Sequence, residues 1–187
     1  MDKTQLKKII TEAIEELVKR DDDIFKQKVP KLGKSTEKER KLNRELHETT
    51  LNHRFANYLE QGLLKTKNFD YNVDIEYNRN FSDQKRVKIG KIRIPVRPDI
   101  LIHKRMRITE NEPHLLVVEA KKHKTTGFDI SKVKAFMEDE KFLYKFGLTI
   151  SYAYDPTKVK AVLYYKDEQK IIKTEGIEVS RKSKTSP

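Results

Sequence analysis

Two short stretches of the sequence place acidic and basic side chains inside otherwise apolar runs. VRPDILIH, over residues 96–103, carries Asp99 directly after a proline, and LLVVEAKK, over residues 115–122, carries Glu119 and Lys121 near its end. Alternate residues of a β-strand point to the same side, so Glu119 and Lys121 share one face of their strand. If the two strands are neighbours, Asp99 meets them on a single patch.

This combination of side chains suits hydrolysis of a phosphodiester bond. Two carboxylates a few ångströms apart repel each other, which raises the pKa of one of them unless a cation intervenes. Oxygen ligands of this kind suit Mg²⁺ or Mn²⁺, and the backbone carbonyl of Ala120 offers a further oxygen. A lysine beside such a metal orients or activates a water and neutralises charge that develops on a phosphate. We therefore expect Asp99 and Glu119 to bind the metal and Lys121 to assist the attacking water.

A long helix predicted over residues 36–62, with Gly62 at its C-terminal cap, offers a third acid. Glu48 lies in the middle of its apolar face, one turn before Leu51, and Glu45 lies at the edge. A carboxylate on an apolar stripe is unusual. Glu48 is therefore the first candidate for a further metal ligand and Glu45 the second. The alternative is that Glu48 pairs with a neighbour on its own helix.

The remaining segments predict an α/β domain. A second helix is expected over residues 129–146, with Asp129 as its N-cap and Gly147 as its stop. The order of helix, strands, helix and strands predicts a mixed central β-sheet flanked by helices. An amphipathic helix over residues 4–20 precedes this core. The strands are expected over residues 71–79, 87–96 (with Gly90 at a bend or bulge), 99–103, 114–121, 148–154, 158–166 and 170–179.

Pro98-Asp99 followed by Glu119-Ala120-Lys121 resembles the PD-(D/E)xK motif of the restriction-endonuclease-like nucleases. The two acids are separated by 19 residues, which is normal for a hairpin with a loop. The order of elements also resembles the core of that superfamily, in which a helix, a three-stranded meander, a crossing helix and a further strand follow one another. The resemblance covers about residues 40–155.

The resemblance implies a restriction-endonuclease-like core and hydrolysis of nucleic acid that depends on Mg²⁺ or Mn²⁺. Members often carry an extra acid on the first helix that joins the metal site, a place that Glu48 fills here. They also often carry a polar or basic residue on the helix after the motif, for which Lys132 is a better match than Lys134. The implied metal ligands are Glu48, Asp99, Glu119 and the carbonyl of Ala120.

The charge of the chain points to a polyanionic partner. Lysine and arginine outnumber aspartate and glutamate, 41 to 29, which gives a net charge of +12. Basic segments over residues 84–93, 103–107 and 121–126 surround the motifs and are expected to neutralise phosphates, although they are equally explained as solvated loops. Nucleic acid is the expected partner, with DNA favoured because most members of the superfamily cut it. The expected contacts come from Arg97, Lys104, Lys122, Lys124 and Lys132.

Other classes of protein are disfavoured. The sequence has no cysteine, and it has neither a G-x-S-x-G turn nor a glycine-rich loop for a nucleotide cofactor. A transmembrane run and a signal peptide are also missing from it, so we expect a cytoplasmic protein with no membrane partner. We expect an N-terminal helix and linker over residues 1–35, a nuclease-like domain over residues 36–180 and a flexible tail over residues 181–187.

Three readings of function follow. The leading one is an endonuclease or exonuclease from a phage, a mobile element, defence or repair. The N-terminal helix is expected to pack on the domain or on a second subunit, and in a homodimer an exposed apolar face of this helix would form the contact. The second is a catalytically silent nucleic-acid-binding or scaffold protein that retains the nuclease fold and binds DNA without metal. A third, a protein that binds anionic membranes through its N-terminal helix, is weaker because that helix is nearly balanced in charge.

Overall fold

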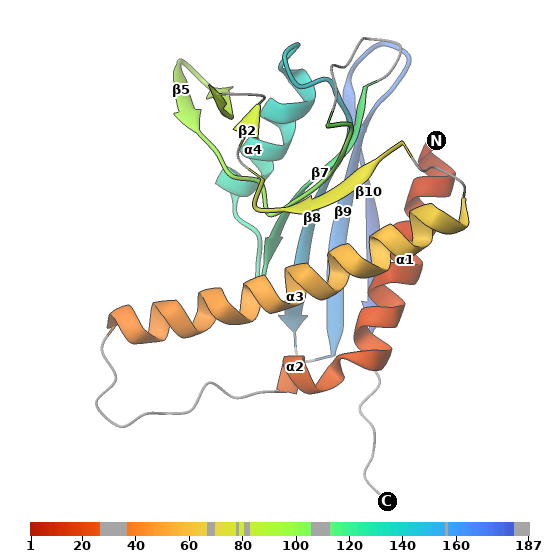
Figure 1. Ribbon diagram of the computed structural model, residues 1–187, viewed down its shortest axis with the longest axis vertical. Helices are drawn as coiled ribbons and strands as arrows, with labels where there is room; N and C mark the ends of the chain where they lie inside the picture. Colours follow the sequence, from red (N-terminus) through yellow and green to blue (C-terminus); the bar gives the residue numbers. More distant parts are fainter. Residues whose placement is uncertain are drawn as a thin grey trace, which may run out of the picture.

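The structure is a computed structural model that describes residues 1–26, 37–66, 70–77, 79–80, 83–105, 113–155 and 157–181. Within these ranges, residues 23, 26, 37–47, 79–80, 83–84 and 154–155 are described by their backbone alone. Figure 1 shows a central sheet with α1 and α3 packed together on it and α4 set apart from them. The four helices are α1 (Lys3–Arg20), α2 (Asp22–Lys26), α3 (Glu37–Lys65) and α4 (Gly127–Glu138).

Six strands form one mixed sheet in the order β1-β6-β7-β8-β9-β10. Neighbouring strands are antiparallel except for β7 and β8, which are parallel and are joined through α4. This confirms the predicted α/β class with a mixed sheet flanked by helices. Two short ribbons, β2–β3 and β4–β5, lie outside the sheet. The strands are β1 (Asn72–Ile75), β2 (Arg79–Asn80), β3 (Asp83–Gln84), β4 (Arg86–Ile89), β5 (Ile92–Pro95), β6 (Ile100–His103), β7 (His114–Lys121), β8 (Tyr144–Asp155), β9 (Lys158–Lys166) and β10 (Ile172–Ser180).

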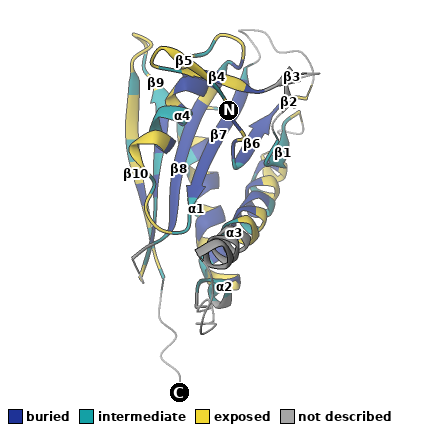
Figure 2. Cartoon of the chain, turned by 90° about the vertical axis from the view of Figure 1, so that its left-hand side faces the viewer, coloured by how far each residue is buried: buried dark blue, intermediate teal, exposed yellow. Residues whose placement is uncertain are grey.

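The two faces of the sheet bury separate hydrophobic clusters, because alternate residues of a strand point to opposite sides. Ile100 and Val118 belong to the cluster that includes α1 and α3. Leu101 and Val117 belong to the cluster that includes α4. Figure 2 shows that β7 and β8 are buried along most of their length. The middle of the sheet is therefore a rigid frame for side chains at the strand ends.

Helix α1 belongs to the main core. Its N-cap is Asp2, whose carboxylate accepts a hydrogen bond from the backbone N–H of Gln5. The apolar face of α1, which includes Leu6, Ile10 and Ile14, is buried in the cluster shared with α3 and the sheet. The expectation that this helix packs on the domain is therefore confirmed, and the expectation that its apolar face is exposed as a dimer contact is wrong. The same pattern of apolar residues serves the chain's own core.

Two glycines were assigned wrong roles from the sequence. Helix α3 continues to Lys65, and Gly62 lies inside it where a Cβ would come within 2.7 Å of Ile9. Helix α4 ends at Glu138 rather than at residue 146, and Gly147 lies within β8. A Cβ on Gly147 would lie 2.2 Å from Val133 of α4. In both places the glycine allows two elements to pack closely, and it does not end a helix.

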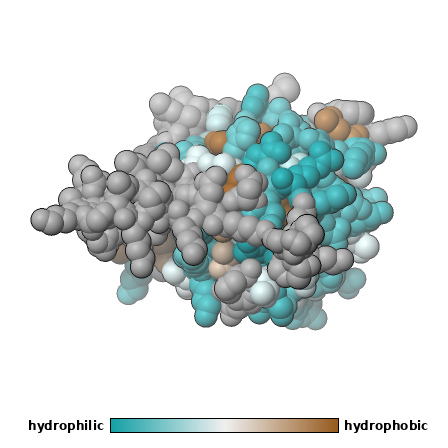
Figure 3. Space-filling model, turned by 90° about the horizontal axis from the view of Figure 1, so that it is seen from below, coloured by the Kyte–Doolittle hydropathy of each residue, from teal (hydrophilic) through white to brown (hydrophobic). Residues whose placement is uncertain are grey.

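The segment predicted as one strand over residues 87–96 is a two-stranded ribbon. Strands β4 and β5 are antiparallel and are joined through Gly90, whose φ of 61° is a left-handed conformation that favours glycine. Figure 3 shows the molecule from below, where the residues that the structure describes are largely hydrophilic with small hydrophobic areas between them. In the described part of the chain, no helix combines the length and the apolar character needed to cross a lipid bilayer.

Candidate active site

Strands β6 and β7 place the two motif acids side by side. Ile100 is paired with Val118 and Leu101 with Val117, and the same register continues to place Asp99 opposite Glu119. Since Leu101 and Val117 face α4, the acids project toward the same side of the sheet. The shared face predicted for the two acids is confirmed.

Asp99 is half-buried, in an electrostatically mixed setting. Its Oδ2 accepts a 2.7 Å hydrogen bond from the backbone N–H of Ala120. Burial raises the pKa of Asp99 above its usual range, while the charges of Lys121 and Lys132 and the Ala120 hydrogen bond oppose this effect. The charge of Glu48 raises the same pKa further. Lys121, Lys132 and Glu48, which the sequence placed near Asp99, thus each affect its pKa.

Glu119 is the most buried acid of the group, with 1 % of its residue surface exposed. Burial, followed by the negative charge of Asp99, raises the pKa of Glu119 to about 7. Its Oε2 accepts a hydrogen bond from Lys132, which also pairs with Asp129 at 3.3 Å. The predicted basic residue on the following helix is therefore Lys132, which has a side chain only 16 % exposed.

Lys121 links the strand pair to the long helix. Its Nζ lies 3.4 Å from Oε1 of Glu48 on α3. Burial lowers the pKa of Lys121, but the charges of Asp99, Glu48 and other nearby acids outweigh this and leave the pKa raised. Lys121 is therefore a cation throughout the neutral pH range. Glu48 faces the site as predicted, whereas the side chain of Glu45 lies outside the described residues.

The pair of acids fits a divalent cation in two respects. Oε1 of Glu119 is buried without a hydrogen-bond partner among the described groups, which is an unfavourable state for a carboxylate oxygen. The mutual repulsion of Asp99 and Glu119 is the second, because a cation between them relieves it. Mg²⁺ commonly binds through one or two carboxylates and completes its shell with water and phosphate oxygens.

The third ligand remains a prediction. Within the described residues, no group of three or more histidine, aspartate or glutamate side chains is arranged to hold a metal. The carboxylate of Glu48 contacts the ammonium of Lys121 rather than the two motif acids. The carbonyl of Ala120 belongs to the same strand end, but its role as a ligand also stays a prediction.

The residues predicted to bind phosphate differ in their exposure and in the groups that they contact. Arg97 has a side chain 60 % exposed and pairs with Glu76 at 3.4 Å. Lys122 is half-buried and Lys124 is exposed, both in the segment that leads from β7 into α4. The ammonium of Lys104 lies 5.8 Å from the ring centroid of Tyr71, on the loop side of β6. Lys132 lies among the acids, so its first partner is Glu119 and not a phosphate.

Sequence reasoning missed several groups around the acids. Thr126, not Asp129, is the N-cap of α4, and Asp129 closes the capping box from the third position of the helix. Phe128 is 55 % exposed, and its ring centroid lies 5.6 Å from the ammonium of Lys132. The tandem threonines before Gly127 were the available signal for the earlier cap, since threonine is a preferred N-cap.

A buried hydrogen bond fixes α3 beside the site. The hydroxyl of Tyr152 on β8 donates to Oδ1 of Asn52 at 2.8 Å, one turn after Glu48. The hydroxyl lies close enough to the site for Asp99 and Glu48 to add to the burial that raises its pKa. Tyr152 was read as a sheet residue from the sequence, and nothing in the pattern identified Asn52 as its partner.

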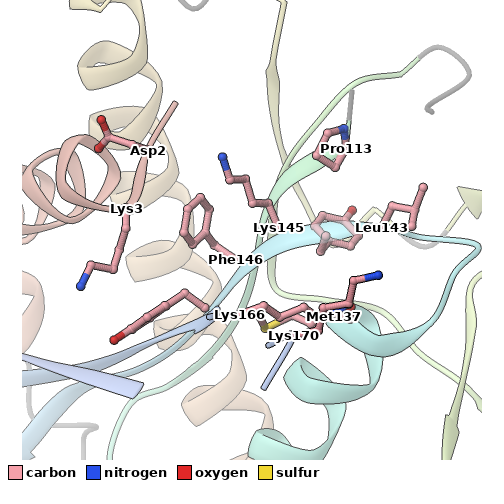
Figure 4. Close-up of a pocket in the computed structure, with 11 residues that line it drawn as sticks. Asp2, Lys3, Pro113, Met137, Leu143, Lys145, Phe146, Lys166 and Lys170 are labelled. Atoms are coloured by element: carbon pink, nitrogen blue, oxygen red, sulfur yellow. The ribbon is translucent and has the colours of Figure 1, made fainter. Parts of the chain in front are cut away.

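A pocket of about 700 Å³ lies at the opposite end of the sheet, where β8 begins and β9 ends. Figure 4 shows Lys3 and Lys145 extending in different directions around it. Lys145 donates to the backbone carbonyl of Met1, and Lys166 to that of Met137. Lys145 and Lys166 are thus engaged in contacts with the backbone. The pocket is lined by neither Asp99 nor Glu119.

The amino-acid sequence matches no protein-family model. A comparison with curated proteins likewise gives no match. The case for function therefore rests on the geometry and chemistry of the site.

Proposed function

We propose that the protein is a metal-dependent nuclease that hydrolyses phosphodiester bonds of nucleic acid, with DNA as the favoured substrate. Asp99 and Glu119 bind Mg²⁺ or Mn²⁺, Glu48 is the candidate third acid, and Lys121 assists the attacking water. The observation that carries the proposal is the pair of half-buried Asp99 and buried Glu119, placed opposite each other with a cationic lysine two residues beyond Glu119 on the strand.

The electrostatics of the pair supports this assignment. A structural ion-pair network neutralises its acids, whereas here both acids have raised pKa values despite the nearby lysines. Strongly perturbed carboxylates that also leave an oxygen without a partner are typical of functional sites. A divalent cation between the two carboxylates would offset the cost of burying their charge, which the two lysines offset only in part.

The residues of the site have separate roles in the proposed reaction. When bound, the divalent cation supplies positive charge to the phosphate and lowers the pKa of water. The ammonium of Lys121 donates hydrogen bonds that orient the water for attack on phosphorus and offsets charge on the phosphate oxygens as the bond to the leaving oxygen breaks. Lys132 holds Glu119 from the α4 side, and Ala120 holds Asp99 through its N–H. Both carboxylates are thereby positioned before substrate arrives.

The connection of the elements supports a restriction-endonuclease-like core as part of the same proposal. Strands β1, β6 and β7 form an antiparallel meander, α4 crosses over, and β8 returns parallel to β7. Asp99 directly precedes the second strand of this meander, and Glu119 and Lys121 lie near the end of the third. The ribbon β4–β5 is an insertion between the first two of these strands.

A cleavage assay tests the proposal. The protein is incubated with supercoiled plasmid, linear duplex and single-stranded DNA, each with Mg²⁺, Mn²⁺ or a chelator. We expect cleavage that requires a divalent cation and is abolished in the Asp99→Ala variant. Cleavage that persists in the chelator would contradict the metal-dependent mechanism.

One observation favours a second candidate, a silent nucleic-acid-binding protein. Lys132 and Lys121 already contact Glu119 and Glu48, and lysines in these places substitute for a cation in holding the acids. Such a protein would shift DNA in a gel in a salt-dependent way and leave it uncut with every metal. The same assay therefore separates the two candidates.

A further inference from the structure

The ribbon β4–β5 stands outside the main sheet and is fixed to α4. Val87 is fully buried in the cluster that contains Val133 and Phe136, and Ile89 and Ile94 are packed against it. Figure 2 shows the exposed surface of β5 at one end of the molecule, close to α4. The inner side of the ribbon is therefore accounted for by packing, and its outer side faces solvent.

The outer side carries three basic residues, of which one is paired with an acid of the fold. Lys88 and Arg93 are directly opposite each other in the register, and Arg86 lies on the same side, two residues before Lys88. Like charges in this relationship destabilise a two-stranded ribbon. Arg93 pairs with Asp139 at 3.8 Å, and Lys88 and Arg93 line a pocket near the end of α4 with Glu138 and Asp139. Among the described residues no acid forms an ion pair with Arg86 or Lys88.

The ribbon leads directly to the candidate site. Strand β5 ends at Pro95, and only residues 96–98 separate it from Asp99. Arg93 lies six residues before Asp99, so the chain places it within about 20 Å of the acid at 3.3 Å per residue. This is less than one turn of duplex DNA, which rises roughly 34 Å.

We propose that the outer side of β4–β5, formed by Arg86, Lys88 and Arg93, binds the phosphate backbone of duplex nucleic acid beside the bond that is cut. This inference rests on the proposed function and assigns its substrate class as double-stranded. A two-stranded ribbon fits the major groove of B-form DNA, and phosphates neutralise Arg86 and Lys88, for which the described part of the fold provides no ion pair.

The composition of the ribbon favours a duplex over a single strand. Proteins that hold single strands stack the bases on aromatic side chains. The outer side of β4–β5 consists of Arg86, Lys88, Arg93 and Pro95 and has no aromatic ring. Ile92 is 67 % exposed at the turn, but one apolar residue does not provide the broad apolar face that membrane binding requires.

The test compares two variants that lose the same charge. Arg86→Gln/Lys88→Gln removes two cations from the ribbon, and Lys8→Gln/Lys19→Gln removes two exposed cations from α1. Binding to a labelled duplex and to a single strand of the same sequence is measured by fluorescence anisotropy in chelator over a series of salt concentrations. Arg86→Lys/Lys88→Arg preserves the charge and serves as the rescue variant, and circular dichroism checks the fold of all three.

We expect the ribbon variant to lose about tenfold or more of its duplex affinity, with a slope of log affinity against log salt that is shallower by about 2. The α1 variant and the rescue variant should bind as the wild type does. A ribbon variant that binds duplex like the α1 variant, or that loses single-strand affinity equally, overturns the inference. The binding measurement needs no metal, so it is independent of cleavage. A wild-type protein that cuts no DNA would contradict the proposed nuclease activity, whereas the anisotropy result alone decides whether the ribbon binds duplex.

Discussion

The backbone N–H of Ala120 donates a 2.7 Å hydrogen bond to the carboxylate of Asp99, which joins the start of β6 to the end of β7. Asp99, which precedes β6, is thus held by Ala120, which follows Glu119 on β7. This contact places Asp99 and Glu119 at a fixed separation and explains why the two motif segments act as one unit.

Replacing Asp99 with asparagine separates the charge of this residue from its structural role. Asparagine retains an oxygen that accepts the Ala120 hydrogen bond, so the fold should be preserved. Burial is the main cause of the raised pKa of Glu119 and Asp99 is the second, so the Glu119 pKa should fall from about 7 but stay above its ordinary value. Cleavage should drop about a hundredfold or more. Carbon-13 NMR titration of labelled glutamate measures the first effect, and an unchanged Glu119 pKa would contradict the coupling.

Lys132→Met should destabilise the protein in a pH-dependent way. A carboxylate whose pKa is raised in the folded state reduces stability as pH rises from its unfolded pKa, near 4.5, to its folded pKa, near 7. Removing Lys132 raises the folded pKa of Glu119 further, so the loss should reach about 3 kcal/mol at pH 8 and be much smaller at pH 5.

Urea denaturation at the two pH values measures this difference, with Lys134→Met on the exposed side of α4 as the control. Adding Glu119→Gln to Lys132→Met should restore most of the stability at pH 8. Equal losses at both pH values would show that the ion pair to Glu119 is not the cause.

His114 should set part of the acid limit of stability. It lies buried between His103 and Tyr144, with ring centroids 5.5 and 4.9 Å away, and burial followed by nearby positive charge lowers its pKa to about 3. His114 is therefore protonated below about pH 6.5 in the unfolded chain but stays neutral down to about pH 3 in the folded chain. The free energy of unfolding consequently falls as pH drops from about 6.5 toward 3.

The substitution His114→Gln should make the pH dependence of the unfolding free energy shallower between these limits. His53→Gln on the exposed side of α3 should leave the slope as it is in the wild type. Thermal unfolding over a pH series provides the comparison. A His114→Gln curve parallel to that of the wild type would rule out this histidine as the cause.

Gly147→Ala tests the close packing of β8 on α4. The new Cβ would lie 2.2 Å from Cγ1 of Val133 and 2.9 Å from Sδ of Met137, so the helix must shift. We expect a loss of about 1–3 kcal/mol in the free energy of unfolding. Gly176→Ala on β10, where a Cβ meets nothing within 4 Å, should be close to neutral. If both variants unfold at the same urea concentration, then the contact with α4 is not limiting.

The strand pattern was sufficient to predict the acid pair. Asp99 and Glu119 each stand in a short apolar run, and alternation fixes their face wherever the two strands pair. Helical periodicity likewise put Glu48 on the inner face of α3. It could not identify Lys121 as its partner, because a contact between residues so far apart in sequence depends on how α3 crosses the sheet.

Two of the wrong predictions concern the position where α4 ends and the surface that covers the apolar face of α1. Tyr144 continues the helical face of Val133 and Phe136, whereas Phe142, Tyr144 and Phe146 together recur at every second position, which is the period of a strand, so the end of α4 at Glu138 did leave a sign in the hydrophobic pattern. The chain turns instead through Leu143, at a φ of 46°, without a glycine or a proline to mark the place. An amphipathic helix such as α1 predicts a buried face but not the surface that covers it, which here is the protein's own core.

Single-turnover cleavage of duplex DNA by Lys121→Ala, compared with Lys134→Ala, tests the central claim most directly. Lys121 is two residues from Glu119 at the site, whereas Lys134 is exposed on α4, and both variants lose one lysine. The account predicts that wild type and Lys134→Ala cut at similar rates with Mg²⁺, and that Lys121→Ala binds the duplex but cuts at least about a hundredfold more slowly. Cleavage by Lys121→Ala at the wild-type rate would show that the chemistry does not take place at this site.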